Sequence, residues 1–281
     1  MPSHSQPTPP ANRVRLQKAM AEAGIGARRD CEEMITSGRV RVNGRVVDTL
    51  PAFVDPASDV VELDGEPIEL PLPEARPSAA AKPRALTYVL VNKPKGVITT
   101  TRDPEGRRNV LDLVPAQLRR EERLYPVGRL DGDSTGLLLI TNDGDLAYQL
   151  THPKFGITKE YRVLCAGLAT EEQLQKLRAG MYLVTPAADG SKSAKRASME
   201  SVRIVKRYVD RARGDRTLLS ITLREGQNRE IRRMLARVGL KVRELERVAF
   251  GPLRAGDLQP GQARLLGKKD VERLRAATLG S

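Results

Sequence analysis

The sequence is poor in histidine, cysteine and aromatic residues, and these shortages exclude several kinds of chemistry. Only two histidines occur, His4 and His152, so counting alone nearly excludes a histidine metal site or a serine–histidine–aspartate triad. The two cysteines, Cys31 and Cys165, lie far apart in the chain, and we expect buried thiols rather than a disulfide or a metal site. Aromatic residues make up 3% of the chain and tryptophan is absent, which argues against extensive stacking on bases of the kind that RNA recognition motifs use.

Long hydrophobic runs are also missing. No apolar stretch approaches the roughly 18 residues that a membrane span needs. The N-terminal MPSHSQPTPPANR has no hydrophobic centre of the kind that a signal peptide requires. We therefore expect residues 1–12 to be a disordered tail, and the protein to be cytoplasmic with no membrane partner.

Positive charge is abundant. The 281 residues include 48 Lys and Arg against 35 Asp and Glu, a net charge of +13. Such an excess favours binding to polyanions through the release of counterions. The alternative is a soluble protein that is merely basic. The length suggests about two domains.

Residues 13–70 show a compact pattern of two short helices followed by short strands. RLQKAMAEAG and ARRDCEEMITSG each place apolar residues on one helical face and end at glycine. RVRVNGRVV alternates valine with arginine and turns at Asn43-Gly44, which predicts a hairpin. Four arginines can form one basic face here, or can simply be solvated surface charge: Arg28, Arg29, Arg39 and Arg41.

Residues 71–86 are rich in Pro and Ala without periodicity, which is typical of a linker. Residues 87–281 contain many expected strands and scattered helices, at 144–151, 170–179, 226–238 and 268–277. This mixture predicts an α+β fold: a small helix-and-strand module, then a mixed, largely antiparallel sheet with flanking helices.

The stretch GRLDGDSTGLLLITNDGDL, residues 128–146, places four acids around a run that reads as a fully buried strand, residues 137–140. For Asp143 and Asp145 we favour structural roles, the first in an Asn-Asp-Gly turn and the second as a helix cap. Asp131-Gly132-Asp133-Ser134-Thr135 also fits the D-x-D-x-T pattern of haloacid-dehalogenase-type phosphatases, and partly a calcium loop, although the context fits both poorly.

A third interpretation makes Asp131 alone the chemical group. It is expected at a strand end, two residues after Arg129, where a carboxylate can act as a nucleophile or base. This interpretation needs a cationic partner from elsewhere in the chain.

EGQNREIRRMLARVG, residues 225–239, offers such a partner. One face of this predicted helix is apolar, with Ile231, Met234, Leu235 and Val238. The opposite face carries a stripe suited to phosphates, made of Arg229, Arg233 and Arg237. Arg232 falls at the border, where it can be half-buried and reach a carboxylate, or be one more surface arginine.

Together these segments resemble the pseudouridine synthases, in the branch that modifies ribosomal RNA. The resemblance covers residues 13–267 and rests on VNKPKGVITT, DPEGRRNVLDLVP, GRLDGDSTGLLLITNDGDLA, HPKFGITKEYRV, EGQNREIRRML and RVAFGPLRAGDLQPGQARLL. Residues 13–60 resemble the S4-type RNA-binding module that accompanies this branch.

The resemblance implies site residues. Asp131 of G-R-L-D is the expected catalytic aspartate, Tyr161 of K-x-Y-x-V is expected against the target base, and Arg232 is expected to pair with the aspartate. The chain departs from the family at Gly132, often tyrosine, and at Ser134-Thr135, usually in the order Thr-Ser.

The resemblance also implies isomerisation of a uridine in ribosomal RNA with no metal, nucleotide or redox cofactor, after the base leaves its stack. It favours large-subunit over small-subunit RNA, and we expect a monomer. Two other interpretations stay open: a non-catalytic RNA-binding assembly factor, and a metal-dependent phosphatase.

Overall fold

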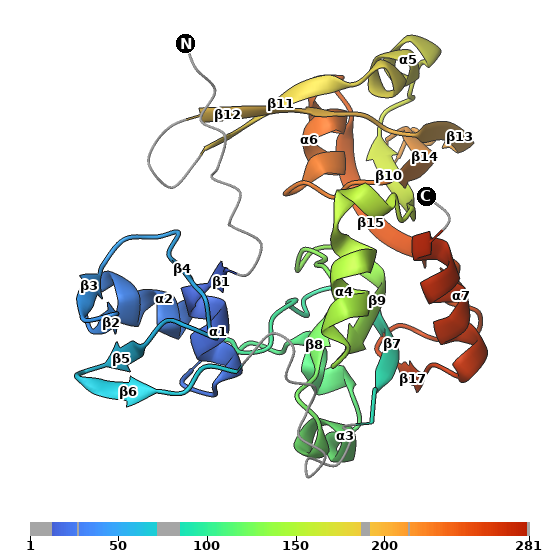
Figure 1. Ribbon diagram of the computed structural model, residues 1–281. Helices are drawn as coiled ribbons and strands as arrows, with labels where there is room; N and C mark the ends of the chain where they lie inside the picture. Colours follow the sequence, from blue (N-terminus) through green and yellow to red (C-terminus); the bar gives the residue numbers. More distant parts are fainter. Residues whose placement is uncertain (1–12, 27, 72–84, 187–191, 213, 280–281) are drawn as a thin grey trace. The chain divides into compact units, whose positions relative to one another are not determined.

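The chain divides into two units, residues 1–84 and 85–281. The computed structural model describes residues 13–26, 28–71, 85–186, 192–212 and 214–279 (Figure 1). The predicted tail, residues 1–12, and residues 72–84 of the predicted linker lie outside the described residues. Within the described residues, no helix combines the length and the apolar character that crossing a membrane requires.

In the first unit two helices are followed by strands, as predicted, but one two-residue strand, Val14–Arg15, precedes them. The helices are α1 (Leu16–Glu22) and α2 (Arg28–Thr36). A four-stranded antiparallel sheet has the order β3-β2-β5-β6, with β2 (Val40–Val42), β3 (Arg45–Val47), β5 (Val61–Leu63) and β6 (Glu66–Ile68), and β1 (Val14–Arg15) pairs with β4 (Phe53–Val54). Asn43 and Gly44 both have positive φ, 53° and 75°, so they form the predicted tight turn between β2 and β3.

The second unit is built on one large mixed sheet with the strand order β13-β14-β10-β15-β9-β7-β17. The strands are β7 (Tyr88–Lys93), β9 (Thr135–Thr141), β10 (Lys159–Ala166), β13 (Ser201–Tyr208), β14 (Arg216–Leu223), β15 (Lys241–Phe250) and β17 (Ala263–Leu265), with β8 (Tyr125–Pro126) beside β9 and β16 (Leu253–Arg254) beside β15. Of these pairs only β15–β9 is parallel. The predicted α+β class with a largely antiparallel sheet is therefore confirmed.

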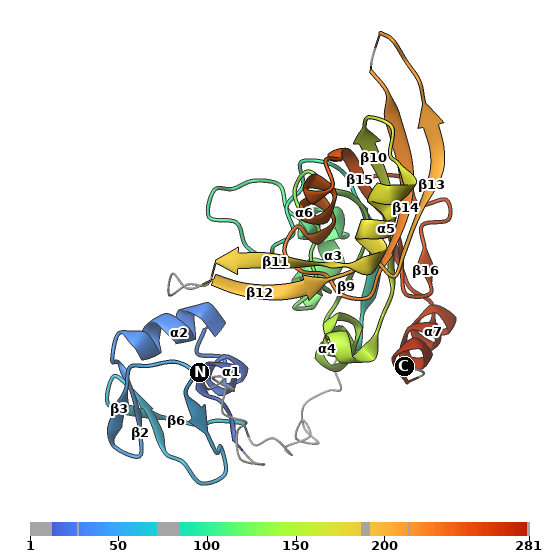
Figure 2. The same ribbon diagram turned by 90° about the horizontal axis from the view of Figure 1, so that it is seen from above.

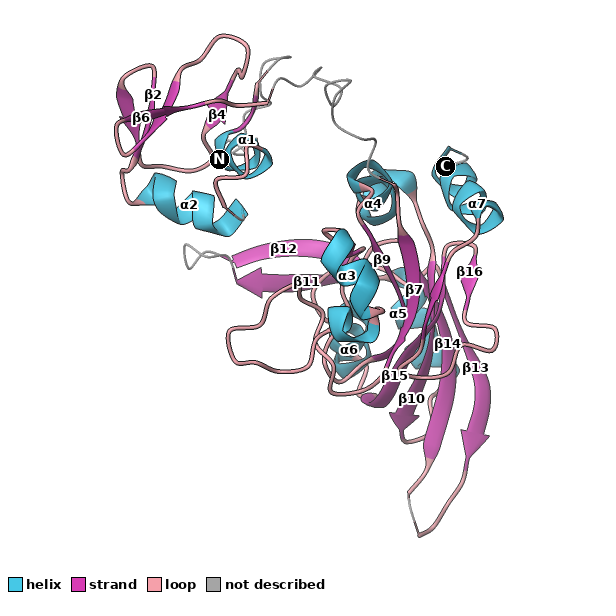
Figure 3. Cartoon of the chain, turned by 90° about the horizontal axis from the view of Figure 1, so that it is seen from below, coloured by secondary structure: helices cyan, strands magenta, loops and turns pink. Residues whose placement is uncertain are grey.

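Helices lie along the sheet, and a separate ribbon projects from it (Figures 2 and 3). The helices are η1 (Val110–Leu113), α3 (Ala116–Glu121), α4 (Gly144–Thr151), η2 (Pro153–Phe155), α5 (Glu171–Ala179), α6 (Glu230–Arg237) and α7 (Lys268–Leu279). The ribbon pairs β11 (Met181–Pro186) with β12 (Lys192–Ala197). The predicted start of α6 at residue 226 is wrong, because Arg229 has a left-handed φ of 48° and the helix begins only after it.

Strand β9 forms the centre of the core. Leu137 and Leu139 pack in a cluster with residues of α4 and α7, whereas Leu138 and Ile140 pack with residues of β7 and η1. Both faces of the strand are thus covered, which explains the uninterrupted apolar run in the sequence. A third cluster lies under α5 and α6 and includes Cys165.

Two smaller predictions met different outcomes. Cys31 and Cys165 are free and buried, as expected. The N-cap of α4 is Asp143, whose side chain accepts a hydrogen bond from the Leu146 amide. The predicted cap at Asp145 is therefore wrong, because Asp145 lies in the first turn of the helix.

Candidate active site

Asp131 lies in the loop that leads into β9. The loop turns sharply, since the Ser134 amide donates to the Asp131 carbonyl oxygen at 3.0 Å. The segment after β7 holds it from the side: Gly96 N–H donates to the Gly132 carbonyl at 2.8 Å, and the Thr99 hydroxyl donates to the Leu130 carbonyl at 2.7 Å. The Asp131 side chain is 27% exposed, so the carboxylate is fixed in place yet accessible.

Lys93, the last residue of β7, supports this loop from inside the protein. The residue is fully buried, and its Nζ donates to the carbonyl oxygens of Ser134 at 2.7 Å and Pro94 at 3.0 Å. Burial lowers the pKa of Lys93 to about 8, although the carboxylates of Asp133 and Asp131 oppose this shift. Sequence reasoning missed Lys93 as a site residue; the available signal was a lysine ending an otherwise buried strand.

Two arginines from the α6 region face the loop. Arg229 Nη1 lies 3.2 Å from Asp131 Oδ2, and Arg229 Nη2 lies 3.4 Å from Asp133 Oδ2. Arg232 Nη2 lies 3.1 Å from Asp133 Oδ2 and also donates to the Asp133 carbonyl and the Ser134 hydroxyl, both at 3.3 Å. The expected pairing of Arg232 with Asp131 is therefore not what the structure has: the partner of Asp131 is Arg229.

The local backbone explains this difference. Arg229 precedes the first turn of α6 in a left-handed conformation, so its side chain leaves the helix start and reaches over the loop, where it stays 45% exposed. Arg232 lies within the helix and is only 13% exposed. Its guanidinium consequently reaches the Asp133 carboxylate and the loop around it, which agrees with one of the two interpretations of its border position on the helix.

A pocket of about 330 Å³ opens beside Asp131, within the size range of small-ligand sites. It brings together Asp131, Tyr161, Arg232 and Arg229, and Arg129 also lines it. Tyr161 lies on β10 and is 8% exposed, so one wall of the pocket is a nearly buried ring. Apolar side chains also line the pocket, namely Leu130, Leu223, Ile231 and Leu245.

Two buried charged residues lie close to this pocket and were not predicted. Glu230 lines it, is buried, and accepts a hydrogen bond from the Gln227 amide at 2.7 Å. Burial raises the pKa of Glu230. Lys159 of β10 donates to the Arg224 carbonyl at 2.8 Å, and burial lowers its pKa to about 8.

The predicted arginine stripe of α6 has a different arrangement from the one expected. Arg237 donates to the Tyr182 carbonyl at 2.6 Å, and Arg233 donates to the Val184 carbonyl. Both acceptors belong to β11, so these two side chains hold the ribbon to the helix. The prediction of a solvated stripe is therefore wrong for Arg233 and Arg237.

The arginines predicted in the first unit are also differently placed. Arg28 and Arg29 begin α2 and are exposed. Arg39 forms a bidentate ion pair with Asp64, and Arg41 donates to the Gly44 carbonyl at 3.3 Å. Arg28 and Arg29 are thus the members of this set most available to an external anion.

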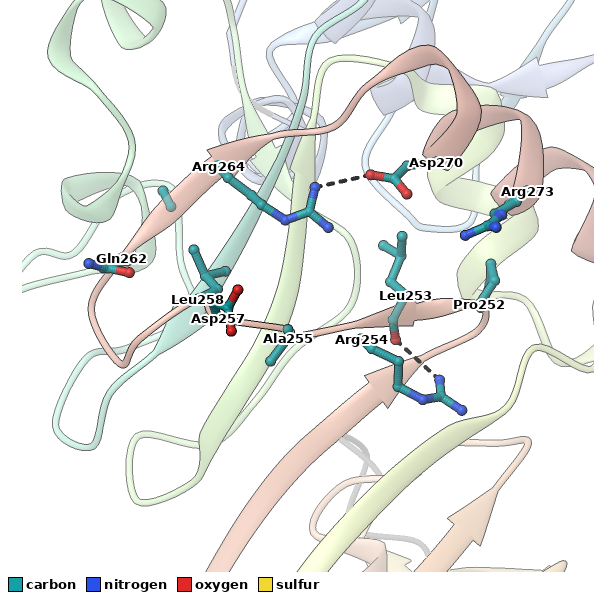
Figure 4. Close-up of a pocket in the computed structure, with 12 residues that line it drawn as sticks. Pro252, Leu253, Arg254, Ala255, Asp257, Leu258, Gln262, Arg264, Asp270 and Arg273 are labelled. Carbon is teal, nitrogen blue, oxygen red and sulfur yellow. Dashed lines mark hydrogen bonds and ion pairs between the residues drawn. The ribbon is translucent and has the colours of Figure 1, made fainter.

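A larger hollow, of about 810 Å³, lies between β16 and α7 (Figure 4). An ion pair of 3.0 Å between Arg264 and Asp270 crosses part of it, and Arg254 and Arg273 also line it. None of the predicted catalytic residues reaches this hollow. The site with converging functional groups is the pocket at Asp131.

That pocket presents a carboxylate that can act as a nucleophile or base, an adjoining ring wall and fixed cationic groups. A planar, uncharged group can lie against the ring, and the cationic groups can bind an anionic chain to which that group is attached. The same cations would oppose a divalent metal at Asp131 and Asp133, because like charges repel.

The sequence profile described as RNA pseudouridylate synthase matches residues 87–237, and the S4 domain profile matches residues 14–60. The chain is 37% identical over 262 residues to the Bacillus subtilis protein named ribosomal large subunit pseudouridine synthase B, with 93% of this chain and 96% of that protein covered. The Pseudomonas aeruginosa protein of the same name is 36% identical over 259 residues, covering 92% of this chain and 61% of the relative.

A solved structure described as a pseudouridylate synthase has the same fold. It superposes with a TM-score of 0.57 at 24% identity, covering 93% of this chain and 99% of the other. Taken with the matched profiles and the relatives, this shows that the chain is an RNA pseudouridine synthase, a member of the RNA pseudouridylate synthase family that carries an S4 domain.

Proposed function

We propose that this enzyme converts a uridine of large-subunit ribosomal RNA to pseudouridine in the cytoplasm, with Asp131 as the catalytic carboxylate. The observation that carries the proposal is the convergence of Asp131, Tyr161, Arg229 and Arg232 on one pocket. The preference for large-subunit RNA is supported by the names of the Bacillus subtilis and Pseudomonas aeruginosa relatives.

The reaction exchanges one bond for another within a single nucleotide. The bond between N1 of uracil and the ribose breaks, the base turns, and C5 forms the new bond to the ribose. N1 gains a proton and C5 loses one, so the formula is unchanged and no electrons are transferred. The isomerisation therefore requires no redox cofactor and no nucleotide.

We assign roles to the pocket residues from their positions. Asp131 acts on the target nucleotide, because its carboxylate is the accessible acid of the pocket. Tyr161 lies against the base, since its ring forms a wall of the same pocket. Arg232 is a positioning residue that holds the loop through Asp133 and Ser134.

The target base has to leave its stack before it can enter the pocket. Exposed Arg129 and Arg229 at the pocket can hold the phosphates on either side of the flipped nucleotide. In the first unit, Arg28 and Arg29 would add affinity for the same RNA by contacts that carry no chemistry.

Tritium release tests the assignment against its rivals. The full-length protein is incubated with ribosomal RNA labelled with tritium at C5 of uridine, with and without EDTA. Release that persists in EDTA supports the synthase. RNA binding without any release would instead support the assembly factor, and phosphatase activity that EDTA abolishes would support the metal enzyme.

Mapping of modified uridines tests the choice of RNA. In a strain lacking this gene, one pseudouridine should disappear from large-subunit RNA, and small-subunit RNA should be unchanged. Loss of a small-subunit pseudouridine instead would contradict the proposed substrate while leaving the enzyme class intact.

A further inference from the structure

The few aromatic residues of the chain are unevenly distributed. The sequence has six tyrosines, three phenylalanines and no tryptophan. Tyr148, His152 and Phe155 nevertheless meet at the end of α4 and in η2, with ring centroids 5.0 Å apart for Tyr148 and His152 and 6.0 Å apart for Tyr148 and Phe155. We call these three residues and Lys154 the ring cluster.

Lys154 adds a positive charge to the ring cluster. Its Nζ lies 4.6 Å from the centroid of Phe155 and 5.5 Å from that of Tyr148, within the range of cation–π attraction. The backbone N–H of Lys154 donates to His152 Nδ1 at 3.2 Å, which fixes the imidazole at the start of η2. The cluster is therefore preorganised, with an ammonium group beside ring faces.

Three members of the ring cluster face solvent, namely Tyr148, His152 and Lys154, whereas Phe155 is partly buried against the core. Helix α4 packs inward through Leu146 and Leu150, which are fully buried. Tyr148 lies on the other side of the helix and is 51% exposed, and His152 and Lys154 are exposed too. Core packing therefore accounts for Phe155 but not for the rings of Tyr148 and His152, since the helix is already anchored without them.

The residue that precedes His152 of the ring cluster lies beside a residue that lines the active-site pocket. Thr151, the last residue of α4, lies against Gly128, where a Cβ added to the glycine would be 3.7 Å from the threonine methyl carbon. Gly128 is the first residue of the segment that lines the pocket and ends at Asp131. A nucleotide next to a base in the pocket can consequently reach α4.

We propose that the ring cluster binds single-stranded RNA next to the target uridine, with an unpaired base stacked on Tyr148 and a phosphate beside Lys154. This inference rests on the proposed function, because it takes the occupant of the pocket to be a flipped uridine. Removing that uridine from its stack leaves its neighbours without a stacking partner, and exposed aromatic rings offer one. The positive charge of Lys154 favours a polyanion over an uncharged partner.

A binding assay with synthetic RNA tests this proposal. The probe is a single-stranded 12-mer of uridines with one central 2-aminopurine, whose fluorescence falls when the base stacks. We expect the wild-type chain to quench it, and Tyr148→Leu to bind roughly tenfold more weakly with the quenching lost. Tyr148→Phe should behave as wild type, because it keeps the ring. Lys154→Ala should lower the salt slope of binding by about one.

Tyr208→Leu is a matched control. Tyr208 also lies under cationic groups, with Lys206 Nζ 5.1 Å and Arg216 Cζ 5.5 Å from its ring centroid. Tyr208 is distant from the active-site pocket. It pairs across the sheet with Arg216, and Arg216 pairs with Ala166 of β10. Ala166 lies about 17 Å along β10 from Tyr161, which lines the pocket. This variant should bind and quench as wild type does.

The inference is wrong if Tyr148→Leu, still folded by its melting curve, retains wild-type affinity and quenching; the ring cluster would then be a surface for another protein or for local packing. It is also wrong if Tyr208→Leu loses quenching equally. Because this assay needs no turnover, its failure is distinguishable from failure of the proposed function, which would appear as absent tritium release by the wild-type enzyme.

Discussion

Arg229, at the start of α6, and Asp131, in the loop before β9, form an ion pair with 3.2 Å between Nη1 and Oδ2. This contact joins two segments that lie far apart in the sequence at the pocket where the chemistry is proposed to occur. Arg232, one turn further along, contacts Asp133 and Ser134 instead. The two arginines therefore have different tasks, one toward the reacting carboxylate and one toward the loop that carries it.

This difference predicts unequal responses to lysine. Arg229→Lys should keep kcat within a few-fold, because the Arg229 side chain is 45% exposed and a lysine can still place a positive charge beside Asp131. Arg232→Lys should lower kcat by about tenfold or more, because Arg232 is only 13% exposed and holds the loop through Nη2, at the end of a planar guanidinium that a shorter, differently shaped lysine does not replace. Tritium release at saturating RNA measures both, and equal losses in the two variants would contradict the division of tasks.

Gly136 should be irreplaceable for stability. An added Cβ would lie 2.2 Å from the Arg247 carbonyl oxygen, and the φ of +107° is strained for any other residue. Gly136→Ala should therefore destabilise the fold by about 3 kcal/mol or more, since the parallel contact between β9 and β15 has to open. Gly132→Ala is the control, because its nearest contact would be an ordinary 3.7 Å. Thermal melting that is equal for the two variants would refute this prediction.

Lys93 predicts a pH dependence of stability. Its pKa is lowered from 10.5 to about 8 by burial, so between these values the folded chain has lost a proton that the unfolded chain still holds. The free energy of unfolding should therefore rise with pH from 8 to 10.5, by up to about 3 kcal/mol from this residue. Urea denaturation of wild type and Lys93→Met at pH 7.5 and 10 isolates the effect, because Lys159 titrates in both proteins. An identical pH dependence in the two would contradict it.

The sequence predicted the elements better than the contacts between them. The apolar run at 137–140, the Asn43-Gly44 turn and the helix at 144–151 are local patterns, and all three occur as expected. The pairing of Asp131 could not be predicted, because it depends on the left-handed backbone at Arg229, which periodicity does not reveal. Lys93 was missed for a related reason: the Ser134 carbonyl, to which it donates at 2.7 Å, belongs to a loop that is distant in the sequence.

The roles of Arg233 and Arg237 illustrate the same limit. Helical geometry placed them correctly on the face opposite the apolar one. Whether this face of α6 is open to solvent depends on β11, because the carbonyl groups of β11 accept hydrogen bonds from Arg233 and Arg237. The ribbon that contains β11 is separate from the main sheet, and no pattern in the sequence predicted where it packs.

Removal of the first unit tests its proposed role in RNA binding. A chain lacking residues 1–80 should have a higher apparent KM on long ribosomal RNA and an unchanged kcat at saturation, because Arg28 and Arg29 supply affinity only. The salt slope of RNA binding should fall as these phosphate contacts are lost. Loss of turnover with unchanged RNA affinity, in a truncated chain shown to be folded, would mean that the first unit completes the active site.

The most direct test of the central claim compares Asp131→Asn with Asp133→Asn. Both aspartates face Arg229, and both substitutions remove one charge, but only Asp131 lines the pocket. Tritium release from C5-labelled ribosomal RNA should be abolished in Asp131→Asn with RNA affinity within a few-fold of wild type, whereas Asp133→Asn should retain measurable turnover. Full activity of Asp131→Asn would contradict the assignment of Asp131 as the catalytic carboxylate.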